Sequence, residues 1–470
     1  MSLTAADFFA GGGGSSSGML KIPGVVLRIA ANHWDLAVRT HELHFPGCEH
    51  RCADLSQADF RTYPRVDLLW GSPECTNHSI AQGRKQAHED RIPDAEGNTL
   101  PTEAGARSRA TMWDIPRYLE AMIIRGRPVL GGVTENVVDV VRWILFPAWR
   151  KAMDALGYDV VPVYLNSAHA HAHRSLWSPQ SRDRVYFLYV LKSLRRKINV
   201  EKWTRPFATC DRHGTVRARQ FFKKRNAEPW GRYRAQYLYL CPEPGCALPV
   251  EPWALPAAEA VDWRNLGQRI GDRAKPLAEK TLKRIEDGLQ RYSRPLMVPT
   301  EGREGKLAKP LDEPGRTQTT RRESAVLFTP AFVAELRGGN SKHRSLADPL
   351  ATITAGGFHH ALVAPPLVIP YYGASRARPV DRPLGTLTTV DRFALLEQEA
   401  RVEDCTLRML QVPEIARAMS FDPDHQILGN KREGTRLLGN AVTPPAAEVL
   451  MSAVVETVTG EDLEPASCPA

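Results

Sequence analysis

A cysteine in a short loop directly after a predicted strand is the feature that most constrains this chain. Residues 66–70 form an apolar run typical of a buried strand, and residues 71–79, rich in glycine, proline and serine, carry Cys75. Open α/β sheets bind ligands at the carboxyl ends of their strands, where this loop is expected to lie. A thiol there can be reached by a substrate and activated by its surroundings. From this loop alone, a buried structural role for Cys75 is as well supported as a reactive one.

The N-terminus carries a second loop of this kind. Asp7, Phe8 and Phe9 precede four consecutive glycines at 11–14, and three serines follow. Glycines allow a tight turn and a close approach of a ligand to the backbone, and the serines can cap a following helix. A glycine-rich turn after the first strand is the usual place for a nucleotide-like cofactor. A flexible tail is the alternative, and the two aromatic residues before the glycines argue against it.

The composition is that of a globular protein with more than one core. The chain has 470 residues, of which 43% are hydrophobic and 24% charged, enough for two or three domains. It has no signal peptide and no apolar run of about 18 residues, so we expect a cytoplasmic protein without a membrane partner. The 62 basic and 53 acidic residues give a net charge of +9, which fits a nucleic-acid partner without establishing one. The 8 scattered cysteines do not resemble a disulfide framework.

Candidate polar residues follow the next predicted strands. Residues 25–30 lead to His33 and Trp34 and then to a helix that ends near His44. Asp54 follows further along the chain, and an acidic residue at the end of a second or third strand commonly binds ribose hydroxyls or an adenine amino group. On its own, Asp54 is a weak signal.

Glu135 and two arginines complete this set. Residues 128–134 are predicted as a strand that ends at Glu135, whose carboxylate can meet the same substrate as Cys75. An exposed surface glutamate is the alternative. Residues 179–188 are predicted as a strand with Arg182 and Arg184 two positions apart, which places both on one face. Two guanidinium groups on one face suit a phosphate or a carbonyl oxygen.

The rest of the N-terminal region is predicted as a polar loop and alternating helices and strands. Residues 81–108 are polar and form a long loop that can close over a substrate. Helices are expected at 112–124 and 146–156, and a strand is expected at 160–165. Two further groups of possible metal ligands are interpreted otherwise: Cys48, His50 and Cys52 as structural, and His169, His171 and His173 as a polar loop on the substrate side.

Residues 196–260 have a different character. Cys210-x2-His213 and Cys241-x4-Cys246 supply four ligands of the zinc type in two pairs. The stretch between the pairs is basic and aromatic. The pattern resembles a zinc ribbon in which one histidine replaces a cysteine, with a wider second pair than usual.

A weak repeat of about 35 residues occupies residues 300–400. Its copies, at 312–319, 347–354 and 381–388, share proline and two threonines in the same phase, which argues against chance similarity. Each copy is short, rich in β-formers and punctuated by turns, and each continues to an apolar pair or triplet. We expect a small β-rich module.

In their order, these motifs resemble the DNA (cytosine-5)-methyltransferases, most closely their phage-like branch. The motifs that carry the resemblance are Asp7–Gly14, Asp54, Pro73-Glu74-Cys75, Glu135-Asn136-Val137, Gln180-x-Arg182-x-Arg184, Arg408–Phe421 and Gly439-Asn440-Ala441-Val442. The resemblance implies an α/β fold with a Rossmann-like methyltransferase domain, a zinc-ribbon-like insert and a β-rich target recognition domain. The expected division is 1–195 catalytic, 196–260 insert, 261–400 target recognition, 401–457 return to the catalytic domain and 458–470 a disordered tail.

The resemblance also assigns roles. Cys75 is the expected nucleophile, Glu135 the expected acid, and Arg184, with Arg182, the expected holder of the base. S-Adenosylmethionine is the expected cofactor, with zinc as a second, and double-stranded DNA is the expected partner of a monomeric enzyme. The cofactor-binding residues implied by the motifs are Asp7, with Phe9 on the adenine, Gly11, Gly13, His33, Trp34, Asp54, Asn440 and Val442.

Two positions depart from the family pattern. Glu74 stands where the family usually has proline, and its carboxylate favours the protonated form of the neighbouring thiol. His33 stands where an acidic residue usually precedes the tryptophan, which weakens the expectation of ribose binding. These departures keep open a different transferred group from a modified sulfonium cofactor, or RNA as the substrate. A catalytically silent DNA-binding protein and an NAD-dependent oxidoreductase fit less well, since both leave Cys75 and Glu135 unexplained.

Overall fold

The computed structural model describes residues 2–74, 111–224, 227–262 and 402–468, together with short pieces between residues 91 and 101 and between residues 264 and 394. The chain forms two compact units. The first comprises Met1–Ser178, Arg182–Ala254 and Met419–Ala470, and the second comprises Pro179–Ser181 and Leu255–Ala418. Among the described residues, none of the helices combines the length and the apolar character needed to cross a lipid bilayer.

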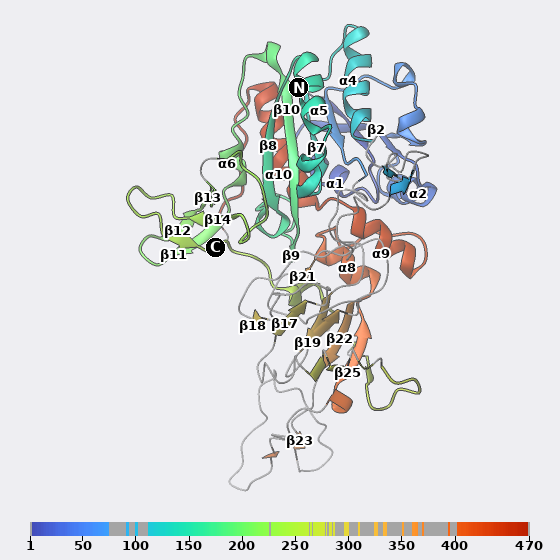
Figure 1. Ribbon diagram of the computed structural model, residues 1–470, viewed down its shortest axis with the longest axis vertical. Helices are drawn as coiled ribbons and strands as arrows, with labels where there is room; N and C mark the ends of the chain where they lie inside the picture. The colour runs from blue at the N-terminus through green and yellow to red at the C-terminus, as the bar shows by residue number, and fades with distance from the viewer. Residues whose placement is uncertain are drawn as a thin grey trace. The chain divides into compact units, whose positions relative to one another are not determined.

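The first unit is built on a seven-stranded sheet with the order β3-β2-β1-β4-β7-β10-β8 (Figure 1). The pairs from β3 to β7 are parallel, and β10 is antiparallel to both β7 and β8. The strand order reverses between β1 and β4, and such a reversal opens a crevice at the carboxyl ends of the strands. The strands are β1 (Leu3–Phe8), β2 (Val25–Asn32), β3 (Glu49–Cys52), β4 (Leu68–Gly71), β7 (Gly131–Asn136), β8 (Tyr158–Asn166) and β10 (Asp183–Leu191).

Helices cover both faces of this sheet because its strands are apolar on both sides. In β1, Ala6 and Phe8 join a core that includes side chains of α4 and α5, whereas Leu3 and Ala5 join one that includes α10. Figure 1 shows the red C-terminal helix α10 beside β7 and β10, so the end of the chain completes the core begun at its start. The helices are α1 (Gly14–Leu20), α2 (Asp35–His44), α4 (Asp114–Ile124), α5 (Phe146–Ala155), α6 (Val200–Thr204), α9 (Lys431–Asn440) and α10 (Pro444–Thr459).

The predicted strands and helices of the first unit are confirmed with end shifts of a few residues, with two differences. The serines after the glycine loop do not cap α1, whose N-cap Gly13 makes no side-chain hydrogen bond. The segment predicted as a long loop, 81–108, lies mostly outside the described residues. Its described pieces are β5 (Arg91–Pro93) and β6 (Thr99–Pro101), which pair antiparallel.

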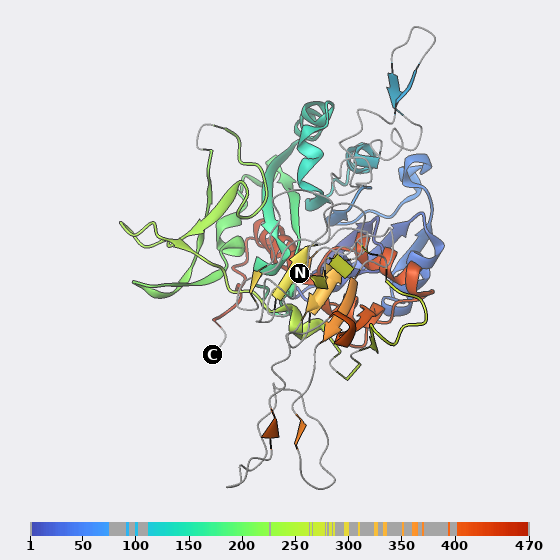
Figure 2. The same cartoon turned by 60° about the horizontal axis from the view of Figure 1, so that its bottom comes forward.

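Two small sheets follow β10 in the first unit. β11 (Phe207–Cys210) pairs with β12 (Gly214–Arg217), and β14 (Tyr237–Leu240) pairs with β13 (Arg219–Phe222) and β15 (Pro249–Val250). In Figures 1 and 2 these yellow-green strands lie beside the sheet, next to β8. The side-chain amide of Gln220 donates to the Tyr164 carbonyl at 2.8 Å, which ties β13 to β8.

The second unit contains another seven-stranded sheet, of order β16-β25-β22-β20-β19-β17-β18. The sequence repeats themselves lie outside the described residues, except Leu350–Ala351 (β21), which pairs with β9 (Gln180–Ser181). The apolar triplets that follow the first two copies form β19 and β22, which pair in parallel at the equivalent positions Leu327 and Val363. The strands are β16 (Gln268–Arg269), β17 (Leu296–Pro299), β18 (Lys309–Pro310), β19 (Ser324–Leu327), β20 (Phe332–Glu335), β22 (His360–Ala364) and β25 (Thr406–Met409). A separate pair comprises β23 (Ile369–Pro370) and β24 (Phe393–Ala394).

The segment after about residue 457, which the sequence predicted to be a disordered tail, packs on the first unit as far as the described residues extend. Helix α10 continues to Thr459, Ala466 is buried, and the Ala466 carbonyl accepts a 2.9 Å hydrogen bond from Arg217. Leu463 packs against the core that contains α10. The burial of Ala466 and the partial burial of Leu463 are what the composition of this short segment did not reveal.

Candidate functional site

The site residues predicted for the first unit gather at one edge of its sheet. Parallel strands present their carboxyl ends at the same edge, and β10, being antiparallel, presents its start there. The register pairs Tyr186 with Glu135 and Val185 with Asn136, so Arg184 begins beside the end of β7. The loops that leave this edge carry Phe9, Gly11 and Gly13 after β1, His33 and Trp34 after β2, Asp54 after β3 and Glu74 after β4.

The loop after β1 has a backbone that requires glycine. Gly11 and Gly13 have φ values of +55° and +89°, in the left-handed region, and Phe9 adopts φ 62° before them. A Cβ on Gly14 would lie 2.0 Å from the carbonyl oxygen of Val442. The glycine run therefore serves both the turn and the close packing of α1 against the segment that precedes α10. Among the described residues, the space above Gly11 is open, since a Cβ there would meet only the Phe9 carbonyl, at 3.9 Å.

The Asp7 carboxylate holds the first turn of α1 through hydrogen bonds. It is fully buried, and its Oδ2 accepts hydrogen bonds from the hydroxyls of Ser15 at 2.5 Å and Ser16 at 2.6 Å. Burial raises the pKa of Asp7 to about 6, against the opposing effect of the two serine hydrogen bonds. Its Oδ1 is buried without a hydrogen-bond partner among the described residues. The serines thus bind the strand carboxylate rather than capping the helix.

The two residues that depart from the family pattern lie together. Nδ1 of His33 is 3.5 Å from Oε1 of Glu74, and both side chains are partly exposed. The neighbouring Trp34 ring stacks under the guanidinium of Arg436 on α9, 4.7 Å from the ring centroid. Asp54 is exposed at the end of β3, and its carboxylate accepts from the amide of Ser56. All three predicted positions after β2 and β3 are accessible to a ligand.

Glu135 and Arg184 form a nearly buried ion pair, with Nε of Arg184 2.9 Å from Oε1 of Glu135. A second nitrogen of Arg184 donates to the Asp183 carbonyl at 2.9 Å, which holds the guanidinium in place. The next residue, Asn136, donates to the carbonyl of Pro73 at 3.3 Å. The end of β7 is therefore linked to the loop that leads to Cys75. Cys75 itself lies outside the described residues.

Arg182, expected on the same strand face as Arg184, has a different partner. It lies between β9 and β10, and its guanidinium donates to the carbonyl of Gly439 at 3.2 Å. Gly439 belongs to the predicted motif that continues with Asn440, which is exposed at the end of α9, and Val442, which is buried against Gly14. Arg182 thus ties the start of β10 to the segment that packs on the glycine loop.

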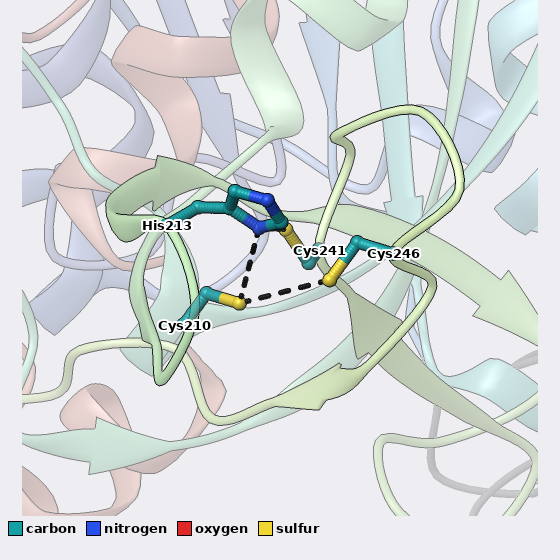
Figure 3. Close-up of side chains that lie close together, drawn as sticks. All are labelled: Cys210, His213, Cys241 and Cys246. Carbon is teal, nitrogen blue, oxygen red and sulfur yellow. Dashed lines mark hydrogen bonds between the residues drawn. The ribbon is translucent and has the colours of Figure 1, made fainter.

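The four predicted metal ligands lie together (Figure 3). Cys210 and His213 flank the β11–β12 turn, and Cys241 and Cys246 lie between β14 and β15. The separations are 3.6 Å from Cys210 Sγ to His213 Nδ1, 3.5 Å from Cys241 Sγ to His213 Nδ1, and 3.9 Å between the sulfurs of Cys210 and Cys246. Tetrahedral zinc with ordinary bond lengths separates sulfur from nitrogen by about 3.6 Å and sulfur from sulfur by about 3.8 Å. The donor set and its spacing fit a zinc ion.

The histidines predicted as a polar loop are for the most part buried. His169 packs edge-on against the Tyr233 ring at 4.4 Å, and His171 stacks on Trp177 at 3.8 Å and accepts from the amide of Phe207. Burial lowers the pKa of His171 to about 4, so it is a neutral core residue. Only His173 is exposed. The prediction of a substrate-side loop was wrong for the first two, because Tyr233 and Phe207, which pack against them, come from a distant part of the sequence.

Sequence reasoning missed a group of histidines beside the glycine loop. His41, Cys48 and His50 form a second cluster whose ligand atoms all lie within 4.8 Å of one another. His425, from the C-terminal region, hydrogen-bonds to the Gly12 carbonyl at 2.8 Å and stacks on His44. Burial lowers the pKa of His425 to about 4. Cys48 and His50 stood out in the sequence, but their third partner lies on α2 and only the fold brings it to them.

The sheet order, the single antiparallel strand and the glycine loop after β1 define a Rossmann-like α/β domain. Residues 3–94 match the family described as C-5 cytosine-specific DNA methylase. Over these residues the chain is similar to this family. A comparison with curated protein sequences gives no match.

Solved structures of low sequence identity align over nearly the whole chain. A prophage-encoded protein of E. coli described as a DNA modification methyltransferase has 14% identity and a TM-score of 0.46, and the alignment covers 98% of this chain and 100% of that one. The methyltransferase EhMeth of Entamoeba histolytica has 11% identity and a TM-score of 0.49, with 97% and 98% covered. A DNMT2 mutant of Spodoptera frugiperda has 12% identity and a TM-score of 0.49, with 97% and 100% covered.

Proposed function

We propose that this protein is a DNA cytosine-5 methyltransferase that uses S-adenosylmethionine and forms a covalent adduct through Cys75. The observation that carries the proposal is the Arg184–Glu135 ion pair at the end of β7, linked through Asn136 to Pro73, two residues before Cys75. The pair supplies a carboxyl and a guanidinium at the place where a nucleophile loop begins. A nearly buried charged pair at the strand edge where open α/β sheets bind their ligands favours a functional role.

The residues at the strand ends fit the cofactor. The open space above Gly11 admits a ligand to the backbone, and His33, Trp34 and Asp54 are accessible after β2 and β3. We assign Phe9 and Trp34 to the adenine ring, Asp54 to polar groups of the nucleoside, and the loop with Gly11 and Gly13 to the rest of the molecule. Asp7, through Ser15 and Ser16, and Val442, against Gly14, hold the start of α1 in place. We also assign Asn440, exposed at the end of α9, to the cofactor site. When bound, S-adenosylmethionine supplies the electrophilic methyl group that carbon 5 of cytosine accepts.

The chain's own residues make carbon 5 nucleophilic. The Cys75 thiolate adds its electron pair to carbon 6, forming the Sγ–C6 bond, while N3 takes a proton from Glu135. Electron density moves to carbon 5, where S-adenosylmethionine, when bound, would supply the methyl group and keep the electron pair of the broken methyl–sulfur bond. Loss of the carbon 5 proton to a solvent-derived base returns the Sγ–C6 electron pair to sulfur, restores the 5,6 double bond and frees Cys75, and the N3 proton returns to Glu135.

The ion pair explains how Glu135 can hold a proton when the base is present. Without a base, Arg184 donates to Glu135 and to the Asp183 carbonyl. When cytosine is bound, its O2 atom can accept the hydrogen bonds that Arg184 otherwise donates to Glu135. The Glu135 carboxyl is then free to turn toward N3. Because the target base lies inside a duplex, it must be flipped out to reach this edge. Arg182 positions the strand start that carries Arg184, through its bond to Gly439.

We also propose roles for the two other parts of the chain. The cluster of Cys210, His213, Cys241 and Cys246 holds a structural zinc ion that joins the two small sheets beside β8. The second unit, with its antiparallel and mixed sheet, contains the target recognition domain and contacts the grooves and phosphates of double-stranded DNA. The enzyme acts as a monomer.

Nucleoside mass spectrometry tests the proposal. DNA from cells that express the protein should contain cytosine heavier by one methyl group, and the Cys75→Ala variant, produced at the same level, should not modify DNA. A heavier adduct on cytosine would assign a different transferred group. Modified cytosine in RNA alone would move the substrate to RNA, and unmodified DNA and RNA from both proteins would make the chain a silent nucleic-acid binder.

A further inference from the structure

A second group of metal-type ligands lies beneath the glycine loop, in the first unit. His41 is in the last turn of α2, His50 is in β3, and Cys48 lies in the connection between them. Nδ1 of His41 is 2.8 Å from Nε2 of His50, and Sγ of Cys48 is 3.5 Å from that same nitrogen. His41 is buried, whereas Cys48 and His50 are partly exposed, so the cluster has a protein side and a solvent side.

The spacing fits a cation with small adjustment. Tetrahedral zinc separates sulfur from nitrogen by about 3.6 Å and two nitrogens by about 3.3 Å. The Cys48–His50 separation of 3.5 Å already matches, and the two imidazoles must move apart by about half an ångström from 2.8 Å. Two imidazoles and one thiolate are ligands of Zn²⁺ and of its neighbours in the first transition row. Three protein ligands leave a fourth position for a water molecule on the exposed side.

The hydrogen bonds behind His41 fix which of its nitrogens faces the cluster. The Ser16 hydroxyl donates its proton to Oδ2 of Asp7 at 2.6 Å, so its oxygen is left to accept from Nε2 of His41, 2.9 Å away. The His41 proton is therefore on Nε2, and the Nδ1 lone pair points at His50 and Cys48. Metal-binding histidines ordinarily donate their second ring nitrogen to an oxygen that fixes the tautomer. The chain His41–Ser16–Asp7 has that arrangement.

We propose that His41, Cys48 and His50 bind a Zn²⁺-class cation, independently of the cluster around Cys210. The location of this cluster beside the glycine loop means that a bound cation would also affect that loop. A Cβ on Gly13 would lie 3.3 Å from the His41 ring and 2.6 Å from that of Phe45, so α2 is in contact with the glycine loop. A cation that fixes His41 to β3 therefore also braces Gly13 and Ser16. The effect on the affinity for S-adenosylmethionine rests on the proposed function, and the metal occupancy does not.

The experiment measures metal content against a matched cysteine variant. The full-length wild type, Cys48→Ser and Cys52→Ser are purified, loaded with Zn²⁺, dialysed against metal-free buffer and analysed by plasma mass spectrometry. Cys52 lies four residues further along and contacts the His33 carbonyl rather than the cluster. Wild type and Cys52→Ser should retain the same zinc content, and Cys48→Ser should retain one equivalent fewer. Equal content in all three proteins overturns the proposal.

A second variant and a second readout cover the case in which Cys48→Ser misfolds. His50→Gln removes a ligand at a partly exposed position and should also lose one equivalent while keeping the wild-type circular dichroism spectrum. With Co²⁺ in place of Zn²⁺, the wild-type spectrum minus the His50→Gln spectrum should contain a single sulfur-to-cobalt band. A flat difference spectrum from two folded proteins overturns the proposal. Because neither readout involves methyl transfer, a protein without transferase activity can still pass this test.

Discussion

Glu74 and His33 are paired, with 3.5 Å between the carboxylate oxygen and the ring nitrogen. Both residues depart from the family pattern, and they come from the loops after β4 and β2. The pair offers a reason why a carboxylate can stand directly before the proposed nucleophile. When the imidazole is protonated it balances the charge that otherwise disfavours a thiolate. The pair also joins a position assigned to the cofactor with the loop assigned to the base.

The balance between these two side chains predicts opposite effects of two variants. Glu74→Gln should lower the pH at which Cys75 reacts half-maximally with iodoacetamide, and His33→Ala should raise it, each by less than about one pH unit because the pair is partly exposed. Peptide mass spectrometry follows Cys75 apart from the other cysteines. Both shifts should shrink at high salt. Shifts of the same sign in the two variants would contradict the charge balance.

Substitutions in the Glu135–Arg184 ion pair should reduce the rate of methyl transfer much more than they reduce the stability of the protein. Glu135→Gln keeps the size of the side chain but removes the proton donor, and single-turnover methyl transfer should fall by about 10²–10⁴-fold. Arg184→Lys loses the second donor of the guanidinium and should fall by a similar factor. The exposed Glu228 pairs with Arg150 at 3.5 Å, so Glu228→Gln serves as the control with the wild-type rate. A rate in Glu135→Gln within twofold of the wild type would remove Glu135 from the mechanism.

The buried Asp7 carboxyl should make the stability of the protein depend on pH, and the Asp7→Asn variant separates this contribution from those of other groups. Its pKa rises from 3.8 to about 6 on folding, because burial disfavours the carboxylate. The folded state therefore binds more protons than the unfolded state in this interval, and the free energy of unfolding falls as pH rises from about 4 to about 6, by on the order of 3 kcal/mol. Asp7→Asn cannot titrate.

Urea unfolding at pH 4.5, 5.5 and 7 measures this effect in the protein without cofactor. The stability of Asp7→Asn relative to the wild type should increase with pH and level off above about pH 6. A difference that is constant across the three values would mean that the native and unfolded pKa of Asp7 are the same.

The protease resistance of the segment around the Cys210 cluster should depend on bound metal. The four ligands of the cluster are the described link between the β11–β12 turn and the β14–β15 connection, and a structural zinc ion contributes several kcal/mol to folding. Chelation or Cys241→Ser should expose the peptide bonds between residues 205 and 254 to limited proteolysis. Cys468 is exposed and lies outside this segment, so Cys468→Ser is the matched control and should leave the cleavage pattern unchanged. Equal protection with and without chelator would show that the two small sheets hold together without metal.

The strands, helices and strand-end residues of the first unit were predictable because they depend on local patterns. Apolar runs and turn residues marked β4 and β7, and the residues that follow each strand are fixed once the sheet is parallel. Glu135 needed only this rule to be placed at the ligand edge. The four ligands around Cys210 were predictable because their spacing in the sequence is itself the signal.

The remaining features depend on contacts between distant parts of the chain. His169 packs against Tyr233 and His171 against Phe207, both far along the chain, so their burial has no local pattern. The pairing of Glu74 with His33 depends on β4 and β2 lying on either side of β1. The third ligand of the site beneath the glycine loop is a helical histidine, and only the packing of α2 on β3 turns it toward Cys48.

A substitution at Gly14 tests the packing of the glycine loop without disturbing the backbone conformation of its turn. Gly14 has no unusual backbone conformation, but a Cβ there would lie 2.0 Å from the Val442 carbonyl, and backbone cannot yield as a side chain can. Gly14→Ala should therefore push α1 away from the segment before α10, with a cost of about 3 kcal/mol or more. Gly47→Ala is the control, since a Cβ at Gly47 meets no atom of the described chain within 4 Å. Thermal unfolding should shift down for Gly14→Ala alone, and isothermal titration should show weaker binding of S-adenosylmethionine. A Gly14→Ala protein with the wild-type melting temperature would mean that the N-terminal loop and the C-terminal segment are not packed as closely as the structure has them.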